Sequence, residues 1–448
     1  MTTNKIKTVL GSTPLPTFTT FSSVAVIVGV VVGIGIFRLP QIVAINSDSG
    51  LQFILFWLAG GLLSLIGALC YAELASSNPD SGGEYHFLSK AFGRPVGFLF
   101  SWGRMTVIQT GSLALVSFIL GDYATLIYNL GSFSPAIYAA ITVIILTGLN
   151  IIGTSHSRKT QMAITSIIVF IMLIISVTAL FFIPSANEAT FTSEASTGFT
   201  GGMAGSAMIF VLLTYGGWNE AAYLSGELIN VRKNMIRVLV AGILIITLLY
   251  LLLNLSYLHV LGLDKIKESD TVGADVTQAV FGNAGSYIVV VIVVLAAIST
   301  ANATIITGAR TNYALGRDFK LLGFMGIWNS KRNTPVNALI VQGAIALILI
   351  FFGAWSKKSV ETMVDYTAPV FWLFLLLTTV SLFVLRKKNH GKETAFRVPL
   401  YPFTPLFFIA ACLFMLYSSL AFTGKGALVG AGFLLVGIPL YLLASYKK

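Results

Sequence analysis

Two clusters of glycine lie inside long apolar stretches, where backbone amides and carbonyls rather than side chains can bind a ligand. The first is Gly33-Ile34-Gly35 in VIVGVVVGIGIFRLP, and the second is Gly216-Gly217 in FVLLTYGGWNEAAY. Glycine is poorly suited to a helix interior, so each cluster predicts a local break. Unwound backbone is tolerated in lipid where it lines a cavity or is buried in protein, and we expect both breaks to line one. Close helix packing is the alternative for Gly29 and for Gly33.

The backbone groups freed at such breaks suit a zwitterion. Amide groups at the start of the half-helix after the Gly-Ile-Gly cluster attract a carboxylate. Carbonyl groups near Val31 and Val32 attract an ammonium, and the second break adds carbonyls near Leu213 and Thr214. The sequence therefore predicts that the backbone of an amino acid is held without an ionised side chain.

Ionisable residues inside apolar stretches are functional candidates by default. Glu220 directly follows Trp218-Asn219. It can accept a proton, meet a cationic group of a substrate, or pair with Arg104 or another core residue. We count Asn219 and Glu220 with the substrate-binding candidates.

Three other charged residues lie near the ends of apolar stretches. Glu73 and Glu227 are expected to form ion pairs that close one face of the protein, with Arg310 or Arg232 as partners. Arg38 follows the first break, where it either draws anions inward or extends to the membrane interface.

Ser299 and Thr300 form an adjacent pair of hydroxyls. Together with carbonyls of the first apolar stretch they would supply the oxygen ligands that a hard cation such as sodium prefers. The alternative is that both hydroxyls bond back to carbonyls of their own helix.

Four aromatic residues are candidates for the wall of a substrate pocket. They are Phe37, Phe210, Tyr215 and Trp218. Plain packing between helices is the alternative for each of them.

These residues need elements that can hold them in a membrane. The chain has 448 residues, of which 56% are hydrophobic and 10% are charged, whereas soluble domains carry about 25% charged residues. A spanning helix needs about 20 apolar residues. Twelve stretches qualify: 21–45, 51–76, 95–122, 135–152, 158–183, 202–230, 235–262, 284–312, 334–354, 362–386, 402–422 and 427–446. Shorter helices are expected within 77–94 and 263–283, and a loop at 184–201.

The distribution of basic residues orients these stretches. An even number of spans places both termini on one side, and most of the 28 Lys and Arg residues fall on that side. The opposite loops hold only Lys265, Lys267, Lys357, Lys358 and Lys425. Positive residues favour the cytoplasm, so we expect a multi-pass protein of the cell membrane with both termini cytoplasmic.

Several function classes are disfavoured. The net charge of +11 resides in short loops, so it reports orientation rather than nucleic-acid binding. No Walker A motif, zinc spacing or cluster of catalytic residues occurs, so neither an enzyme nor direct ATP drive is expected. A channel usually builds its pore from symmetric rings, which two offset breaks do not resemble.

Four motifs, in order, resemble those of the amino acid–polyamine–organocation (APC) superfamily. They are GIGIFRLP, then NPDSGGEYHFLSKAFGRPVGFLFSW, then TYGGWNEAAYLSGELIN, and finally ITGARTNYALGRDF. The third is similar to the L-type amino acid transporter branch. The resemblance covers about residues 20–400.

The resemblance implies an all-α membrane protein of the LeuT-type fold, in which two inverted five-helix repeats and two peripheral helices make twelve spans. It implies a cytoplasmic tail at 1–20, a transport core at 21–400, and two further helices within 401–448. It also implies secondary transport of amino acids by alternating access, as symport or exchange. Matching binding residues are Val31, Gly33, Ile34, Gly35, Leu213, Thr214, Gly216 and Asn219.

Two departures concern coupling and gating. Proton-coupled relatives carry a lysine in the fifth span where this chain has Ile168, which leaves Na⁺ or H⁺ open as the coupling ion and Ser299 and Thr300 as the sodium candidates. Leu213 replaces an aromatic gate. No other cofactor is expected, and the partners implied are the lipid bilayer and an amino acid or amine. Transport of polyamines or cationic amino acids through Glu220 is the alternative function.

Overall fold

The computed structural model describes residues 14–186, 201–269, 271–355, 359–388, 395–423 and 426–446. The elements are α1 (Thr20–Val31), α2 (Gly35–Arg38), α3 (Pro40–Ile45), α4 (Gly50–Ser77), α5 (Glu84–Phe92), α6 (Arg94–Gly103), the π-helix η1 (Arg104–Ile108), α7 (Gln109–Ile127), α8 (Ser134–Ile152), α9 (Thr154–Phe182), α10 (Gly201–Thr214), the 3₁₀ helix η2 (Trp218–Leu224), α11 (Val231–Glu268), α12 (Val272–Phe281), α13 (Asn283–Asp318), the 3₁₀ turn η3 (Lys320–Leu322), α14 (Val336–Trp355), α15 (Ser359–Lys388), α16 (Phe403–Thr423) and α17 (Gly426–Tyr446).

The described residues are entirely helical apart from two isolated β-bridges, Phe18 with Leu228 and Asn329 with Thr334. Among them, nine helices are long and apolar enough to cross a membrane, and two shorter apolar helices lie at Thr20–Val31 and Gly430–Ser445. The expected all-α class is therefore confirmed. The short helices expected within 77–94 and 263–283 correspond to α5 and α12, whereas most of the expected loop at 184–201 lies outside the described residues.

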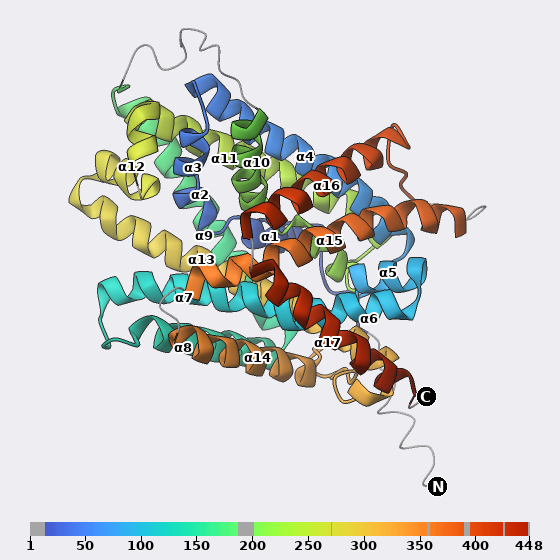
Figure 1. Cartoon of the computed structure of the whole chain (residues 1–448). Coiled ribbons are helices and arrows are strands. Elements are labelled where there is room, and N and C mark those ends of the chain that lie inside the picture. The colour runs from blue at the N-terminus through green and yellow to red at the C-terminus, as the bar shows by residue number, and fades with distance from the viewer. Residues whose placement is uncertain are drawn as a thin grey trace.

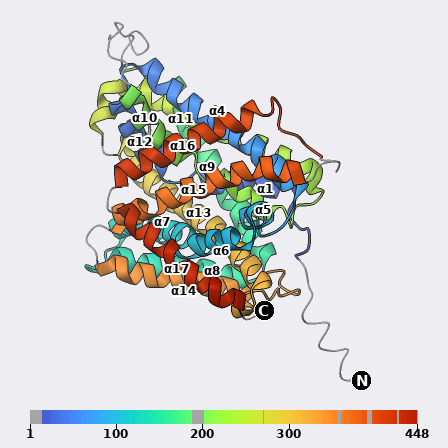
Figure 2. The ribbon, with the colours of Figure 1, turned by 45° about the vertical axis from the view of Figure 1, so that its right-hand side comes forward.

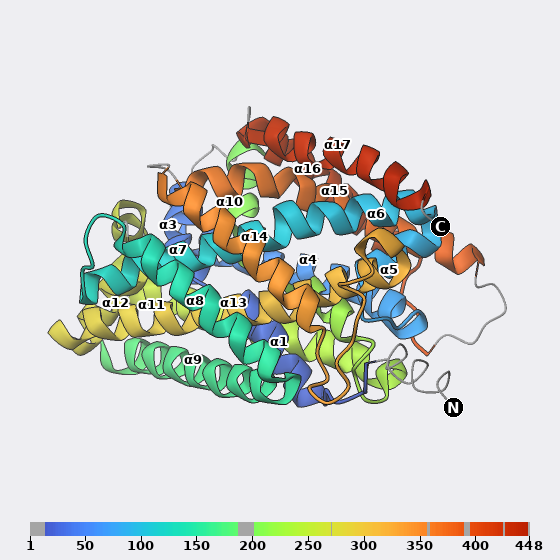
Figure 3. The ribbon, with the colours of Figure 1, turned by 90° about the horizontal axis from the view of Figure 1, so that it is seen from below.

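The long helices run roughly side by side and define two ends of the molecule (Figure 1). α5 lies at one end and α12 at the other, and the same separation is seen after a turn of 45° (Figure 2). Seen from below, α9 lies along one edge, α16 and α17 lie along the opposite edge, and α1 lies between them (Figure 3). We refer to these two extremities as the α5 end and the α12 end.

Local signals explain where several helices begin. The Thr19 hydroxyl accepts a hydrogen bond from the Ser22 amide, and the Ser22 hydroxyl accepts one from the Thr19 amide, which closes a capping box at the start of α1. Ser49 caps α4 by accepting from the Gln52 amide. Pro95 occupies the first turn of α6, where its missing N–H costs nothing.

Two clusters of buried side chains hold the helices together. The larger one joins α1, α4, α9, α10 and α11 around Trp57, Tyr215 and Tyr250. The second joins α5 to α8 with α13 and α14 around Phe98 and Phe319. The two broken segments lie in the first cluster, so the breaks are surrounded by protein.

Candidate functional site

The first break separates α1 from α2. The helix ends at Val31, and Val32 has ψ of 76°, which is not helical. Neither Gly33 nor Gly35 adopts a positive φ. The space beside Gly35 is limited, because an added Cβ there would lie 3.4 Å from the Thr214 side chain and 3.3 Å from the Leu39 side chain.

The second break separates α10 from η2. Gly217 has a φ of 113°, in the left-handed region that glycine alone adopts readily. A Cβ on Gly217 would also lie 2.6 Å from Cγ1 of Val30. The chain then continues as a 3₁₀ helix, so the predicted interruption is confirmed and lies directly against α1.

The two breaks are joined by one phenol from α11. The Tyr250 hydroxyl lies 2.8 Å from the Val31 carbonyl oxygen and 3.1 Å from the Thr214 carbonyl oxygen. Tyr250 is fully buried, and its ring packs edge-on against Tyr215 at 5.0 Å and Trp57 at 6.0 Å. Because a phenol has one proton, it donates to one of the two carbonyls at a time.

The backbone at the first break leaves specific groups open. In the described part of the chain, the amides of Ile34, Gly35 and Ile36 donate to no backbone carbonyl, and the Val32 carbonyl accepts no backbone bond. The Val31 carbonyl is occupied, since it accepts from the Gly33 amide at 2.7 Å and from Tyr250. Of the two carbonyls named from the sequence, Val32 is therefore the open one.

The remaining candidates at the second break are placed differently from one another. Leu213 has an exposed side chain, and its carbonyl accepts from the Gly216 amide at 3.2 Å. Thr214 donates its hydroxyl to the Phe210 carbonyl at 2.8 Å. Asn219 is buried and donates to the Glu84 carboxyl at 3.3 Å.

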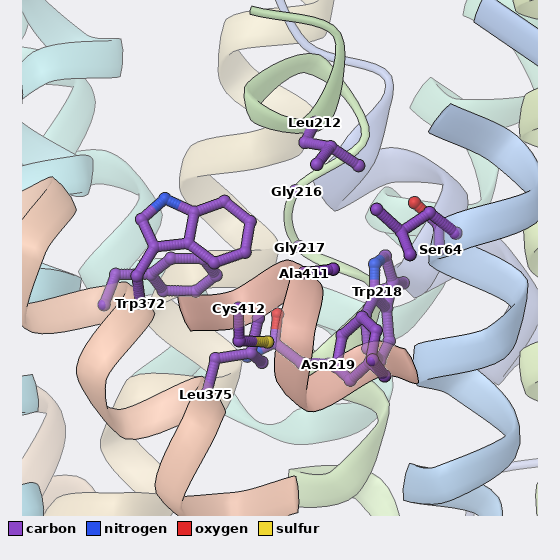
Figure 4. Close-up of a pocket in the computed structure, with 13 residues that line it drawn as sticks. Ser64, Leu212, Gly216, Gly217, Trp218, Asn219, Trp372, Leu375, Ala411 and Cys412 are labelled. Atoms are coloured by element: carbon purple, nitrogen blue, oxygen red, sulfur yellow. The ribbon is translucent and has the colours of Figure 1, made fainter. Parts of the chain in front are cut away.

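A small cavity borders the second break and lies between α4, α10, α15 and α16 (Figure 4). Its wall includes Gly216, Asn219, Trp218, Trp372 and Cys412. Its volume of about 20 Å³ is enough for one water molecule and too small for an amino acid. This cavity by itself therefore does not hold an amino acid.

The aromatic residues expected in the pocket wall mostly pack. Phe37 lies against Gly273 of α12, and Tyr215 donates its hydroxyl to the Trp57 carbonyl at 3.1 Å. Trp218 lines the small cavity and contacts Tyr71 with ring centres 5.1 Å apart. Phe210 is half-buried near the end of α10.

The hydroxyl pair of α13 reaches across to α1. Ser299 donates to the Gly29 carbonyl at 3.1 Å, and Thr300 lies 3.2 Å and 3.3 Å from the carbonyls of Gly29 and Val30. The Gln161 amide of α9 donates to the Ser299 hydroxyl at 2.8 Å. Both hydroxyls thus contact the predicted first-span carbonyls instead of carbonyls of their own helix.

Gly29 has a packing role at this contact. A Cβ there would overlap Gln161, Thr165 and Ser299, so only glycine lets α1, α9 and α13 approach so closely. Ile168, at the position where relatives carry lysine, is buried on α9.

Glu220 lies in a buried ionic group. Its Oε2 is 2.6 Å from Nη2 of Arg104, the first residue of the π-helical turn in the third span. Such turns are frequent at functional sites. Of the roles weighed for Glu220, the structure shows the pairing with Arg104.

The α5 end is held by further ion pairs. Glu227 pairs with Arg310 at 2.5 Å, as expected. Glu73 instead pairs with Arg386 of α15 at 2.5 Å, so Arg310 and Arg232 are wrong as its partners. The sequence could not place α15 beside α4. Arg38 is exposed.

Sequence reasoning missed Tyr250 and Glu84. Tyr250 is a polar group within the apolar run LLYLLLN, and Glu84 stands inside the SGGEY motif. These sequence features could have drawn attention to the two residues. Their roles, however, depend on partners from distant segments, which the sequence does not reveal.

Comparison with known proteins agrees with this architecture. The profile of a family described as "Amino acid permease" matches residues 18–443. Mouse b(0,+)-type amino acid transporter 1 is 31% identical over 433 residues, which cover 95% of this chain and 87% of that protein. The serine/threonine exchanger SteT of Bacillus subtilis is 27% identical over 437 residues, covering 95% and 96%.

The human cystine/glutamate transporter is 27% identical over 435 residues, covering 95% of this chain and 84% of that protein. The family, these relatives and the apolar helices agree with one another. This chain belongs to the amino acid permease family of the APC superfamily, and it is a multi-pass membrane protein that transports amino acids and is not an enzyme.

Proposed function

We propose that this permease exchanges amino acids by alternating access, with the substrate backbone bound between the two helix breaks. The observation that most supports this proposal is that the Tyr250 hydroxyl lies within hydrogen-bonding distance of a carbonyl from each break. Both broken segments therefore border the same small volume, although 183 positions separate Val31 from Thr214 in the sequence.

The open groups fit the two charges of an amino acid. The amides of Ile34, Gly35 and Ile36 would receive the carboxylate, and the Val32 carbonyl would receive the ammonium. The Val31 and Thr214 carbonyls become available to the ammonium when Tyr250 releases them. Gly33 and Gly216 leave room for this approach, while Leu213, Thr214 and Asn219 border the second break.

The site favours a substrate whose side chain is neutral. Glu220 is already paired with Arg104 at 2.6 Å, so its charge is balanced before any substrate binds. The names of the relatives include a serine/threonine exchanger, which favours exchange over net uptake. Transport of polyamines or cationic amino acids, with Glu220 released to meet the cation, is the alternative.

The same contacts bear on coupling. The oxygens of Ser299, Thr300, Gly29 and Val30 have the chemistry that sodium prefers, but the two hydroxyls already donate their protons to those carbonyls. We therefore expect exchange without sodium. Sodium-stimulated exchange that is lost in Thr300→Val would assign the cation to this site instead.

We further propose that the helices form a LeuT-type fold with twelve spans. The segments from α1 to α9 and from α10 to α15 would make the two inverted halves of a core at 21–400. The α16 and α17 helices within 401–448 would be peripheral, and they lie along one edge in Figure 3. Residues 1–20 would form a tail, of which 1–13 lie outside the described residues.

Basic residues support the orientation of this fold. Lys90, Arg317 and Lys388 lie on α5 and on the ends of α13 and α15, while Lys265 and Lys267 precede α12. The α5 end would therefore be cytoplasmic, with both termini on that side. Labelling of single cysteines introduced at Lys90 and Lys265, with an impermeant reagent, should mark opposite faces of the membrane.

The test of transport uses purified protein in liposomes. Labelled amino acids and diamines would be offered with unlabelled substrate inside, with and without sodium. We expect saturable counterflow of neutral amino acids that persists in Glu220→Gln. Counterflow of diamines that Glu220→Gln abolishes would favour the alternative, and no movement of any amino acid would overturn the proposal.

A further inference from the structure

A buried ionic group beside the second break contains an odd number of charged residues. Glu84 begins α5, Arg104 begins η1 and Glu220 lies in η2, so three distant segments meet. Their residues are exposed by only 3%, 2% and 7%. Two carboxyl groups therefore share one guanidinium in the interior of the protein.

The two carboxyl groups lie at different distances from that guanidinium. Glu220 lies 2.6 Å from Nη2 of Arg104, whereas Glu84 lies 3.9 Å from Nη1. The Nε of Arg104 donates to the neutral Thr311 hydroxyl at 3.0 Å. Arg104 thus forms its close pair with Glu220, and Glu84 is the carboxyl in excess.

Two other carboxylates of the described chain have a guanidinium each, which balances their charge. Glu227 is gripped by two nitrogens of Arg310 at 2.5 Å and 3.0 Å. Glu73 is gripped by two nitrogens of Arg386, both at 2.5 Å. Each of those carboxylates has its own guanidinium in a two-pronged contact, which is the strong arrangement for such a pair.

The groups that surround Glu84 can form hydrogen bonds with its carboxyl group in either protonation state. The phenol of Tyr71 bonds one of its oxygens and the phenol of Tyr223 bonds the other. A phenol donates to a carboxylate but can equally accept from a protonated carboxyl. The Asn219 amide donates to Oε1 of Glu84, and this contact survives on a neutral carboxyl.

Burial adds to this asymmetry. It raises the pKa of Glu84 above the ordinary value of 4.5, and the attraction of Arg104 and the bonds from the two tyrosines only partly oppose the rise. An isolated buried charge is so costly that a carboxyl in this position takes up a proton instead.

We propose that Glu84 is a proton-binding site, and that its resident proton leaves the group around Arg104 electrically neutral. The proton comes from water and leaves to water when pH rises. Loss of the proton adds a buried negative charge next to Asn219 and Tyr223, which belong to the segment after the second break. The hydrogen bonds that these two residues donate become stronger on a carboxylate, but the cost of the buried, unbalanced charge exceeds that gain. Loss of the proton therefore destabilises this packed segment as a whole, and in this way the proton acts on the second break.

The groups that face Glu84 come from three other elements. They are Tyr71 on α4, Arg104 on η1, and Tyr223 and Glu220 on η2. On α5 itself, Tyr85 bonds Asp318 at 2.8 Å, and His86 lies 3.7 Å from Asp80. His86 is therefore a titratable neighbour with a separate partner.

The proton can be tested without any transport. A carboxyl with a raised pKa in the folded state binds more protons there than when unfolded, so stability falls as pH rises from the ordinary carboxyl pKa to the raised one. One proton changes the folding equilibrium constant by up to about tenfold for each pH unit in that window. The Tm of the purified wild type should fall accordingly.

Three variants identify the residue responsible. Glu84→Gln should remove this decline of Tm, because the amide cannot ionise. Glu220→Gln should move the decline to lower pH, because Arg104 is then free to stabilise the Glu84 carboxylate. His86→Asn, two residues further along α5, should keep the wild-type decline. A decline that persists in Glu84→Gln, is unmoved in Glu220→Gln or vanishes in His86→Asn would overturn the proposal.

The consequence for transport rests on the proposed exchange. Counterflow measured at equal pH on both sides should fall at alkaline pH in the wild type and become nearly independent of pH in Glu84→Gln. An unchanged pH profile in Glu84→Gln would contradict the link to the break. If no amino acid moves at any pH, the proposed function fails, and the Tm series still decides whether Glu84 holds the proton.

Discussion

The helix breaks and the α5 end both concentrate polar groups inside an apolar protein, but they satisfy them by different means. At the breaks, hydroxyls of Tyr250, Ser299 and Thr300 donate to backbone carbonyls at 2.8–3.3 Å. At the α5 end, carboxylates pair with guanidiniums, as Glu227 does with Arg310 at 2.5 Å.

The difference bears on which region moves easily. A neutral hydrogen bond contributes about 0.5–1.5 kcal/mol, and a substrate's ammonium or carboxylate can replace it. Separating a buried ion pair leaves two charges without partners and costs several kcal/mol unless water enters. The hydrogen bonds at the breaks can therefore exchange partners at a lower cost than the ion pairs at the α5 end.

The largest expected effect is at the α5 end. Glu227→Gln leaves Arg310 buried without its carboxylate and should destabilise the protein by about 3–5 kcal/mol. Thermal unfolding of purified protein measures it. The double variant Glu227→Gln with Arg310→Gln removes both charges and should recover much of the loss. A single variant as stable as the wild type would remove the contrast between the two regions.

Gly217→Ala should have the next largest effect. The left-handed φ of 113° costs a residue with a Cβ about 1–2 kcal/mol, and the new methyl would press on Val30. We expect a folded protein with counterflow reduced by at least tenfold. Gly148→Ala is the control, since Gly148 of α8 has no positive φ and an added Cβ there would meet nothing within 4 Å. Equal losses in both variants would argue against the shape of the second break as the cause.

Tyr250→Phe tests the phenol that joins the breaks. It removes the bond to the Val31 and Thr214 carbonyls and should lower stability by about 1 kcal/mol. The two carbonyls are then free for the substrate's ammonium. We therefore expect the KM for exchange to change by a factor whose equivalent free energy exceeds the loss of stability. Tyr257→Phe, on the same helix, is the control: the Tyr257 hydroxyl has no partner among the described residues. A matching KM change in Tyr257→Phe would refute a specific role for Tyr250.

Thr300→Val should have the smallest effect. The substitution keeps the shape and loses one hydroxyl that contacts Gly29 and Val30, so we expect a stability loss of about 0.5–1 kcal/mol. Counterflow with and without sodium supplies the functional measurement, and no sodium dependence is expected in either protein. Ser299→Ala, which also releases the Gln161 amide, should cost slightly more.

The sequence indicated much of the fold because apolar runs and glycine clusters act locally. The expected stretches coincide with helices to within a few residues, and both breaks occur at the glycines named for them. The glycines of the two breaks differ in conformation, because Gly217 adopts a positive φ and Gly33 and Gly35 do not. Gly35 also lies close to the Thr214 side chain, a neighbour that no local pattern reveals.

Partners across the bundle were harder to foresee. A carboxylate in a membrane signals that some cation lies nearby, but it does not name the helix that carries it. Glu227 and Arg310 were paired correctly, whereas Glu73 meets Arg386 of α15. The excess carboxyl of Glu84 could not be noticed at all until three segments were placed together.

The sequence by itself determined that this chain lives in a membrane, where its helices begin and break, and to which family it belongs, because hydropathy, glycine content and short motifs are properties of neighbouring residues. The tertiary structure decided which carbonyls at the breaks are open, which phenol joins them, and how many charges share one guanidinium. Those features depend on distances between segments more than a hundred residues apart, and only packing sets them.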